Sequence, residues 1–170
     1  LTGNAFFEVA NDGAQEYAEK CELIRKYYPA PALTTDVIVG FPTETDEYFR
    51  QSYDFIESLD LSYLHVFTYS ERENTPAAEM GVSVPPAVRA ARSRALHRLG
   101  EKKRAAFYLR HQGQVREVLL ESENKEGWMF GFTDNYIKVR LPYDPHLVGT
   151  LQAVRLGPQV EDGLLDASLL

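Results

Sequence analysis

The sequence predicts an α/β part followed by an all-β part. Three patterns predict it: a strand–helix–strand succession over 35–69, a long helical pattern over 87–111, and several short β-like runs from 115 onward. A strand, a helix and a second strand within about 35 residues are typical of a βαβ unit with a right-handed crossover. We expect a domain boundary near 111–113, which gives domains at residues 1–111 and 112–170.

The first predicted element is a helix over Ala14–Tyr28, because apolar residues recur there every three or four positions. Pro29 and Pro31 end this helix. The preceding residues, 1–13, show no clear period. Cys21 lies on the apolar side of the helix, where we expect a packed thiol rather than a reactive one.

A strand is predicted over Thr35–Val39, which is continuous in Val and Ile as buried parallel strands tend to be. Gly40 and Pro42 end it, and Asp46 with Glu47 favours the start of a helix through the helix dipole. That helix runs to about Leu59, and a second strand follows over Tyr63–Tyr69. The junction at 36–47 therefore lies at the carboxyl end of a parallel strand, where α/β folds bind ligands.

A Thr-, Pro- and Gly-rich loop over Ser70–Pro86 leads into a basic helix over Ala87–His111. Between Ala87 and Arg110 there are eight basic residues and one acidic residue, Glu101, so this segment carries +7. Because the whole chain carries −7, the remainder carries −14. Segregated charge of this kind indicates either a polyanion contact or a solvated helix whose cations pair with the acidic remainder.

The all-β part is predicted from short β-like runs separated by turn-forming residues. The runs are Val115–Glu121, Trp128–Phe132, Tyr136–Leu141, Gln152–Leu156 and Leu164–Ser168. Several short strands at this spacing are typical of a small β-barrel or sandwich.

Composition narrows the classes of function. The chain has 170 residues, 44% of them hydrophobic, with one cysteine and no apolar run long enough to cross a bilayer. One cysteine excludes an internal disulfide and a metal site built from several thiolates. The four histidines are too dispersed to suggest a metal site, and no catalytic triad is evident, so we name neither catalytic nor metal residues. Without a visible secretory signal, we expect a cytoplasmic protein.

Three segments together resemble a known family. They are Asp36-Val-Ile-Val-Gly-Phe-Pro-Thr-Glu-Thr45, Tyr63-Leu-His-Val-Phe-Thr-Tyr-Ser-Glu-Arg72 continuing to Thr75-Pro-Ala-Ala78, and Gly131-Phe-Thr-Asp-Asn-Tyr-Ile-Lys-Val139. In this order they look like the C-terminal part of radical S-adenosylmethionine tRNA methylthiotransferases, over roughly residues 16–170. The second segment looks most like the branch that acts on N6-threonylcarbamoyladenosine. The branches acting on isopentenyladenosine or on a ribosomal protein remain alternatives.

The resemblance implies a partial TIM-like barrel followed by a TRAM domain, which is a small RNA-holding β-barrel. It also implies an enzyme that adds a 2-methylthio group to an adenosine at position 37 of tRNA, using S-adenosylmethionine and [4Fe–4S] clusters. The cysteine triads that hold such clusters are absent from this sequence. We therefore expect a C-terminal fragment that is inactive alone and binds neither cofactor.

The same resemblance implies the partners. They are tRNA at its anticodon region and the missing N-terminal part of the same enzyme; we expect no membrane or DNA partner. A stand-alone RNA-binding module without catalysis is the alternative if the natural chain begins here.

The resemblance also nominates cofactor-side residues at the two strand ends: Gly40, Phe41, Pro42, Glu44, Val66 and Phe67. Ordinary turn chemistry, for the first four, and core packing, for the last two, are the competing interpretations. Thr43 stands where the family usually has glycine, which puts the turn geometry in question. His65, with no acidic or thiol partner at ligand spacing, is interpreted as structural.

Candidates for RNA contact come from three places: Arg72 in the loop, Arg98 and Lys102 on the basic helix, and Arg116, Asn135, Tyr136, Lys138 and Arg140 in the β part. Arginine and lysine would reach phosphates, and Tyr136 would stack on a base. A surface pair with Glu71 or Glu73 is the alternative for Arg72, and a salt-bridged helix is the alternative for Arg98 and Lys102.

Overall fold

The computed structural model describes residues 11–80, 82–160 and 163–170 and divides into two compact units, Leu1–Lys103 and Arg104–Leu170. Residues 1–10, most of the unpatterned start of the chain, lie outside the described residues. The division falls within one helix, α5 (Pro86–Leu109), so that α5 contributes residues to both units.

The first unit contains the predicted βαβ succession. In order, its other elements are α2 (Asn11–Tyr27), β1 (Thr34–Val39), α3 (Asp46–Ser58), β2 (Tyr63–Thr68) and the short α4 (Pro76–Glu79). β1 and β2 pair in parallel, with Val37 opposite Val66, so the predicted βαβ unit is confirmed. α4 was not predicted; it starts at Pro76, and Thr75 accepts a hydrogen bond from Ala78 N–H as its N-cap.

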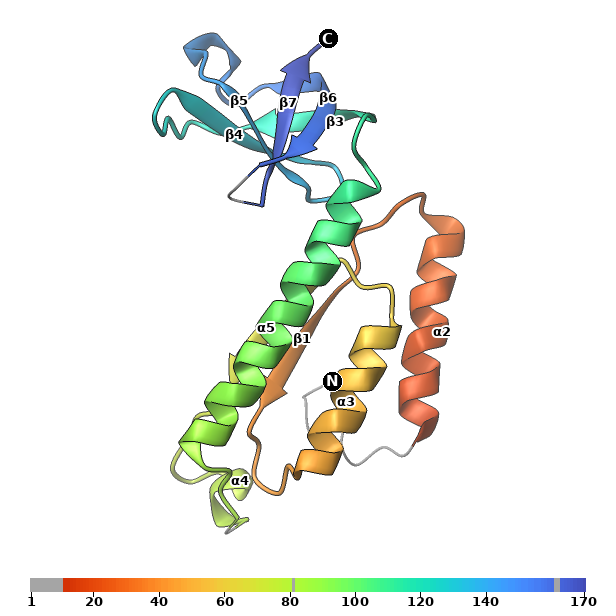
Figure 1. The fold of residues 1–170 in the computed structure, drawn as a ribbon, viewed down its shortest axis with the longest axis vertical. Helices are drawn as coiled ribbons and strands as arrows, with labels where there is room; N and C mark the ends of the chain where they lie inside the picture. The colour runs from red at the N-terminus through yellow and green to blue at the C-terminus, as the bar shows by residue number, and fades with distance from the viewer. Residues whose placement is uncertain (1–10, 81, 161–162) are drawn as a thin grey trace. The chain divides into compact units, whose positions relative to one another are not determined.

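Helices cover one face of this two-stranded sheet (Figure 1). Val37 and Val39 of β1 and Leu64 and Val66 of β2 pack on a core with Cys21 of α2, Ile56 of α3, and Leu96 and Leu99 of α5. α5 approaches β2 closely, because a Cβ on Gly100 would lie 3.4 Å from Leu64 Cβ. Cys21 is buried, as its apolar spacing predicted.

The opposite face of the sheet carries an apolar patch. Ile38 and Phe67 are cross-strand partners and are 39% and 54% exposed. Side chains alternate between the two faces along a strand, so these residues point away from the helical core. The first unit therefore has one packed face and one face that exposes an aromatic ring.

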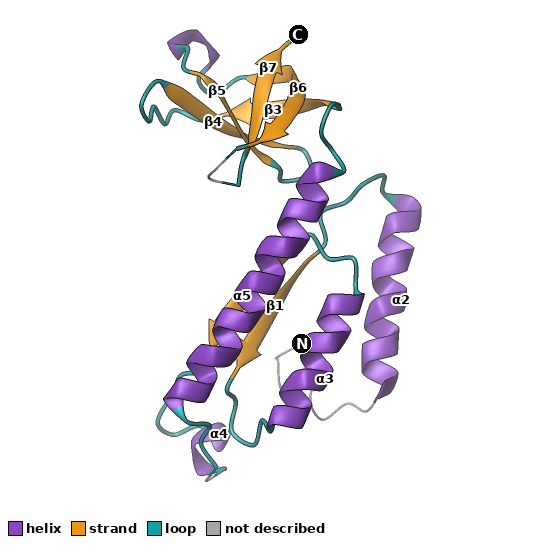
Figure 2. Cartoon of the chain, in the orientation of Figure 1, coloured by secondary structure: helices purple, strands orange, loops and turns teal. Residues whose placement is uncertain are grey.

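The second unit is a closed barrel of five strands with the order β3-β4-β5-β7-β6 (Figure 2). The strands are β3 (Val115–Leu120), β4 (Trp128–Thr133), β5 (Lys138–Pro142), β6 (Leu151–Gln159) and β7 (Leu165–Leu169), with a 3-10 turn at Pro145–Leu147. Fully buried residues from all five fill its core: Val118, Met129, Val139, Val154 and Leu165. Of the two predicted alternatives, barrel and sandwich, the structure is a barrel.

The predicted third strand of this unit begins two residues later than expected. Tyr136 has a φ of +63° and its N–H donates to Thr133 O, so it belongs to the β4–β5 turn. Within the same unit, the end of α5 is tied to β5, since Lys138 N–H donates to the Tyr108 hydroxyl at 2.9 Å. Among the described helices, none is long and apolar enough to cross a lipid bilayer.

Thr43 lies in the glycine-favouring region of the backbone, with a φ of +75°. Its N–H donates to Val82 O at 3.2 Å, which helps to hold the turn in this conformation. A β-branched residue with positive φ is strained by roughly 1–3 kcal/mol. Although threonine replaces the usual glycine at position 43, the turn keeps a backbone conformation typical of glycine, at an energetic cost.

We expect Thr43→Gly to raise the stability of the chain by about 1 kcal/mol, because relief of backbone strain exceeds the entropy that glycine adds to the unfolded state. Thermal unfolding followed by circular dichroism measures this. Thr45→Gly is the matched control, since Thr45 is the N-cap of α3 at a φ of −81° and should only lose stability. A loss of stability in both variants would contradict the strain argument.

Candidate functional site

The candidate site lies at the carboxyl ends of β1 and β2. Val39 pairs with Thr68, and Tyr69 N–H donates to Val39 O at 2.8 Å, so the two chain segments leave the sheet side by side. The segment Gly40–Glu44 follows β1 and the segment Tyr69–Glu71 follows β2. Parallel α/β sheets place their ligands at this end of the strands.

Gly40 makes room for an arginine of α5. A Cβ at Gly40, whose φ is +80°, would lie 2.7 Å from Arg89 Cδ and closer still to Arg89 Cγ. No side chain fits there, so glycine is required by Arg89. Gly40 was nominated as a cofactor-side residue, with ordinary turn chemistry as the competing interpretation; on the side of Gly40 where Arg89 lies, the structure places protein.

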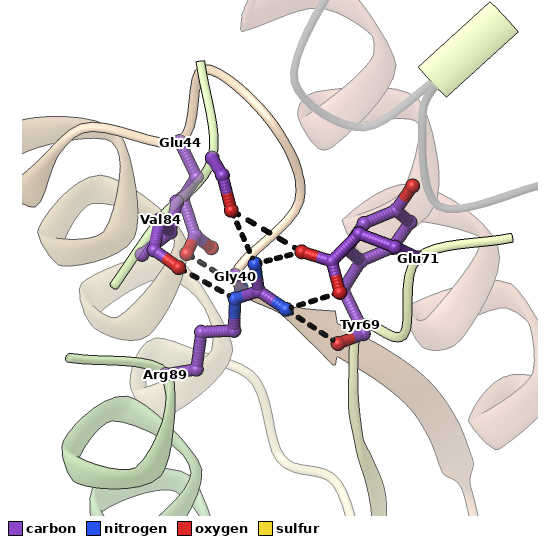
Figure 3. A network of polar contacts seen from close by, with 7 residues as sticks. Gly40, Glu44, Tyr69, Glu71, Val84 and Arg89 are labelled. Carbon is purple, nitrogen blue, oxygen red and sulfur yellow. Dashed lines mark hydrogen bonds and ion pairs between the residues drawn. The ribbon is translucent and has the colours of Figure 1, made fainter. Parts of the chain in front are cut away.

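Arg89 is 7% exposed and donates hydrogen bonds to two segments of the chain, one after β2 and one before α5 (Figure 3). Its Nε donates to Val84 O at 2.7 Å, its Nη1 to Tyr69 O at 3.1 Å, and its Nη2 to Ser83 Oγ at 2.7 Å. Nη1 and Nη2 also donate to the Glu71 carboxylate, as a bidentate pair. The arginine therefore joins the end of β2 to the segment that precedes α5.

Arg92, one helical turn further along α5, joins the end of β1 in the same way. It donates to the Glu44 carboxylate, to Glu44 O at 3.1 Å and to Asp46 Oδ1 at 2.6 Å. Its guanidinium carbon lies 5.3 Å from the centroid of the Phe49 ring. The Glu44 carboxylate, whose side chain is 2% exposed, also accepts from Gly40 N–H at 2.7 Å.

Glu44 is thus engaged with its own protein. The sequence left two interpretations open for it, a position beside the cofactor and ordinary turn chemistry, and the structure has the carboxylate accepting from Gly40 N–H within the turn. Burial of a carboxylate needs a partner of opposite charge and several hydrogen bonds, which Arg92 and Gly40 supply.

The charged pair on the β2 side is more open to solvent. The Glu71 side chain is 55% exposed, whereas the Arg89 side chain is 9% exposed. Hydrogen bonds from Arg89 lower the pKa of the Glu71 carboxyl from 4.5 to about 2. The carboxylate is therefore ionised at neutral pH and available to the buried guanidinium.

The remaining cofactor-side candidates divide between two faces. Val66 packs on the helical core, and Pro42 is buried. Phe67 is on the open face, and the half-buried Phe41 packs edge-to-face on Tyr69 at 5.2 Å between ring centroids. Phe41 and Phe67 are the candidates that the structure leaves near solvent at the strand ends.

The residues at the strand ends fit the adenine of S-adenosylmethionine, but this chain does not supply the ligands of an iron–sulfur cluster. The chain has one cysteine, Cys21, and among the described residues no three His, Cys, Asp or Glu side chains gather to hold a metal ion. An iron–sulfur cluster therefore does not fit the residues of this chain. The aromatic rings of Phe41 and Phe67 fit a planar base such as the adenine of S-adenosylmethionine.

The RNA candidates on the first unit are exposed. Arg72 and Arg98 have exposed side chains, and Lys102 Nζ lies 3.6 Å from Glu57 Oε1. Glu71, named as a partner for Arg72, instead pairs with Arg89. On α5, therefore, Arg89 and Arg92 hold the protein together, while Arg98 is exposed to solvent.

In the barrel, strands β4 and β5 form an alternating surface of aromatic rings and cations, which we call the ladder. It consists of Trp128, Phe130, Phe132, Lys138 and Arg140. Lys138 Nζ lies 5.3 Å and 5.7 Å from the ring centroids of Phe130 and Phe132, and the Arg140 guanidinium carbon lies 4.4 Å from that of Trp128. Cations and rings in this arrangement suit phosphates and unstacked bases.

Tyr136 lies beside the ladder, 69% exposed, with its ring centroid 6.1 Å from that of Phe132. Three barrel candidates are engaged in internal contacts, and one of them, Arg140 of the ladder, forms a salt bridge with Asp166 at 2.7 Å. Arg116 forms a salt bridge with Asp134, and Asn135 is 7% exposed with its amide against Thr133 Oγ1 and His111 Nε2. Asn135 therefore holds the β4–β5 turn from inside, contrary to the RNA-facing position expected for it.

Sequence reasoning missed the structural arginines and the rings of the ladder. The alternation Trp128-Met-Phe130-Gly-Phe132 was a usable signal, because every second residue of a strand shares a face. Arg89 and Arg92 gave no such signal, since their spacing does not differ from that of the exposed arginines.

Glu44→Gln should lower the free energy of unfolding by about 3 kcal/mol, because it leaves the buried Arg92 guanidinium without its main countercharge. Glutamine keeps an oxygen for Gly40 N–H, so the change isolates the charge. Asp46→Asn is the control on the same arginine; its side chain is 95% exposed and should cost less than about 1 kcal/mol. Chemical denaturation measures both, and equal losses would contradict the assignment of Glu44 as the buried partner.

No protein-family model matches the chain, but individual relatives do. It is 35% identical over 139 residues to the threonylcarbamoyladenosine tRNA methylthiotransferase MtaB of Aquifex aeolicus (strain VF5), covering 81% of this chain and 33% of that protein. It is 42% identical over 123 residues to the MtaB of Rickettsia prowazekii (strain Madrid E), covering 72% and 28%.

A second kind of relative is a tRNA-2-methylthio-N(6)-dimethylallyladenosine synthase of Geobacillus thermodenitrificans (strain NG80-2), at 38% identity over 144 residues, covering 84% of this chain and 28% of that protein. The chain thus spans about a third of the length of the curated relatives it matches. The chain belongs to the family of radical S-adenosylmethionine tRNA methylthiotransferases.

Proposed function

We propose that this chain is the C-terminal part of an enzyme that adds a 2-methylthio group to N6-threonylcarbamoyladenosine at position 37 of tRNA by radical S-adenosylmethionine chemistry. The observation that carries the proposal is identity of 35% and 42% to two MtaB proteins over most of the chain. The enzyme would work in the cytoplasm, where its tRNA is.

The architecture supports a division of labour between the two units. The parallel pair β1–β2, with helices on one face, is part of a TIM-like barrel whose other strands lie in the remainder of the enzyme. The β3–β7 barrel is the TRAM domain. In this proposal residues 1–111 supply the partial barrel with its basic helix, and residues 112–170 supply the RNA-holding module.

The chain contributes to cofactor binding through the strand ends. Phe41 and Phe67 would contact the adenine of S-adenosylmethionine, while Gly40, Pro42 and Glu44 shape the turn and Val66 backs the strand from the core. S-adenosylmethionine, when bound with an iron–sulfur cluster, supplies the radical and the methyl group. The cysteines for the clusters must come from outside this chain, because it has only Cys21.

The ladder and Tyr136 would hold the anticodon region of the tRNA. Lys138 and Arg140 are oriented by the rings beneath them, which lowers the entropy lost on meeting a phosphate. Tyr136 offers an exposed ring for a base. Arg72, Arg98 and Lys102 would add phosphate contacts from the first unit, with Arg116 at the side of the barrel.

An isopentenyladenosine-type substrate is the second candidate, since the chain is also 38% identical to a dimethylallyladenosine-type synthase. A ribosomal-protein substrate and a non-catalytic RNA-binding module are further alternatives. The nucleosides of cellular tRNA distinguish the two tRNA substrates from each other and from the last two alternatives.

Deletion of the gene that encodes this chain should remove 2-methylthio-N6-threonylcarbamoyladenosine from tRNA and leave N6-threonylcarbamoyladenosine in its place. Mass spectrometry of digested tRNA measures both. Other 2-methylthio-adenosines should persist, and the intact gene should restore the lost nucleoside. Loss of the isopentenyl-type nucleoside instead would select the second candidate, and unchanged nucleosides would exclude a role in tRNA methylthiolation.

The 170-residue chain should bind an anticodon stem-loop weakly, and added salt should weaken that binding. Tyr136→Ala should reduce the affinity roughly fivefold or more, because base stacking on an aromatic ring contributes about 1–3 kcal/mol. Lys138→Gln should reduce both the affinity and its salt dependence, and reversing Arg98 and Lys102 to glutamate tests α5 in the same assay.

Lys125→Gln is the matched control for this assay, since Lys125 is exposed in the β3–β4 turn and outside the ladder. Fluorescence anisotropy measures all the variants at several salt concentrations. Unchanged affinity in Tyr136→Ala and Lys138→Gln would remove this face of the barrel from the RNA site.

A further inference from the structure

We propose that Arg89 and Arg92 are positioning residues that fix the separation and conformation of the two strand ends. They thereby position the rings offered to the cofactor, Phe41 and Phe67, which we call the aromatic rim. The inference rests on the proposed function for the identity of that cofactor. The two arginines lie three residues apart on α5, so they share a face of the helix. One reaches the segment after β2 and the other reaches the segment after β1.

Arg89 fits closely against Gly40 at the end of β1. The aliphatic stem of Arg89 occupies the space where a Gly40 side chain would be. Its guanidinium extends past Gly40 to Tyr69 O and Glu71. One arginine therefore contacts the ends of both strands at once.

Arg89 is connected to the aromatic rim through the ring of Tyr69. Its guanidinium carbon lies 5.7 Å from the centroid of the Tyr69 ring, and Tyr69 packs edge-to-face on Phe41. A shift of Arg89 would move Tyr69, and with it Phe41. In the proposed function Phe41 contacts the cofactor, so Arg89 acts on the site through these two rings and does not touch the ligand itself.

The two arginine–glutamate pairs differ in their exposure to solvent. The Glu44 side chain is 2% exposed and its pair with Arg92 is sealed, whereas Glu71 is 55% exposed. Ser83 Oγ donates to Glu71 Oε1 at 3.2 Å and accepts from Arg89, which adds the segment before α5 to the same network. Removing the charge of Glu71 should therefore loosen the strand ends and leave the fold intact.

The first test uses amide hydrogen exchange in the 170-residue chain. Glu71→Gln should speed exchange roughly threefold to tenfold at Gly40, Thr43 and Tyr69, because the segments around Arg89 open more often. Amides in the centre of α3 should exchange at the wild-type rate. Arg89→Lys keeps the charge but loses the bidentate fork, so it should have a larger effect at the same amides.

Glu57→Gln is the matched control, since its side chain is 47% exposed and pairs with Lys102 at 3.6 Å in the same unit. It should leave the strand-end amides unchanged. Wild-type exchange at Gly40, Thr43 and Tyr69 in Glu71→Gln would overturn the proposal. Glu71→Gln keeps the test decisive if Arg89→Lys does not fold, because it leaves the other contacts of Arg89 in place.

The second test measures S-adenosylmethionine binding by equilibrium dialysis, using the full-length enzyme that carries this chain. Glu71→Gln should raise the dissociation constant about threefold or more at an unchanged melting temperature, and Glu57→Gln should not. Failure of the wild-type enzyme to bind S-adenosylmethionine would contradict the proposed function. Normal binding by the wild type and equal binding by Glu71→Gln would overturn only the positioning role.

Discussion

The first unit depends on the burial of two guanidinium groups at the start of α5. A buried cation destabilises a fold unless it has partners in good geometry, and Arg89 and Arg92 are 7% and 5% exposed. The segments after both strands supply three carboxylates and two carbonyl oxygens as partners, and the segment before α5 adds Val84 O. The requirement explains the glycine at position 40 and the inward direction of Glu44. The Nε atom of Arg92 is buried without a hydrogen-bond partner in the described part of the chain, so its other contacts must also offset that cost.

The burial of the two guanidinium groups determines which side chains the site exposes. Because α5 holds the strand ends, the polar groups there face one another, and the open face of the sheet presents aromatic rings. Phe67 and Ile38 lie on that face, and Phe41 lies at its end. The barrel uses arginine and lysine differently: Lys138 and Arg140 lie over aromatic rings at its surface, where a phosphate could meet them. The chain thus has buried cations that build a site and surface cations that lie over aromatic rings. Of the surface cations, Arg140 also pairs with Asp166 at 2.7 Å.

The fold followed from periodicity to a large extent. The parallel pair, the helix between its strands and all five barrel strands were predicted close to their observed bounds, because alternation and helical spacing report burial directly. The site was less predictable, since the role of a polar residue depends on what faces it. Arg89 and Arg98 cannot be distinguished by sequence. Asn135 was predicted to contact RNA, but in the structure its amide is enclosed by Thr133 and His111. At Thr43 the departure from the family glycine put the turn geometry in question, and the structure keeps a positive φ there.

Nuclear magnetic resonance of the arginine side chains measures whether Arg89 and Arg92 are held rigidly against the strand ends. A guanidinium with several fixed partners rotates slowly about its Cζ–N bonds and gives separate Nη resonances. Arg89 and Arg92 should give separate Nη resonances in the 170-residue chain at neutral pH. The exposed Arg98 should give a single averaged resonance. Averaged resonances for all three arginines would show that the buried network does not hold the strand ends, and would contradict the account.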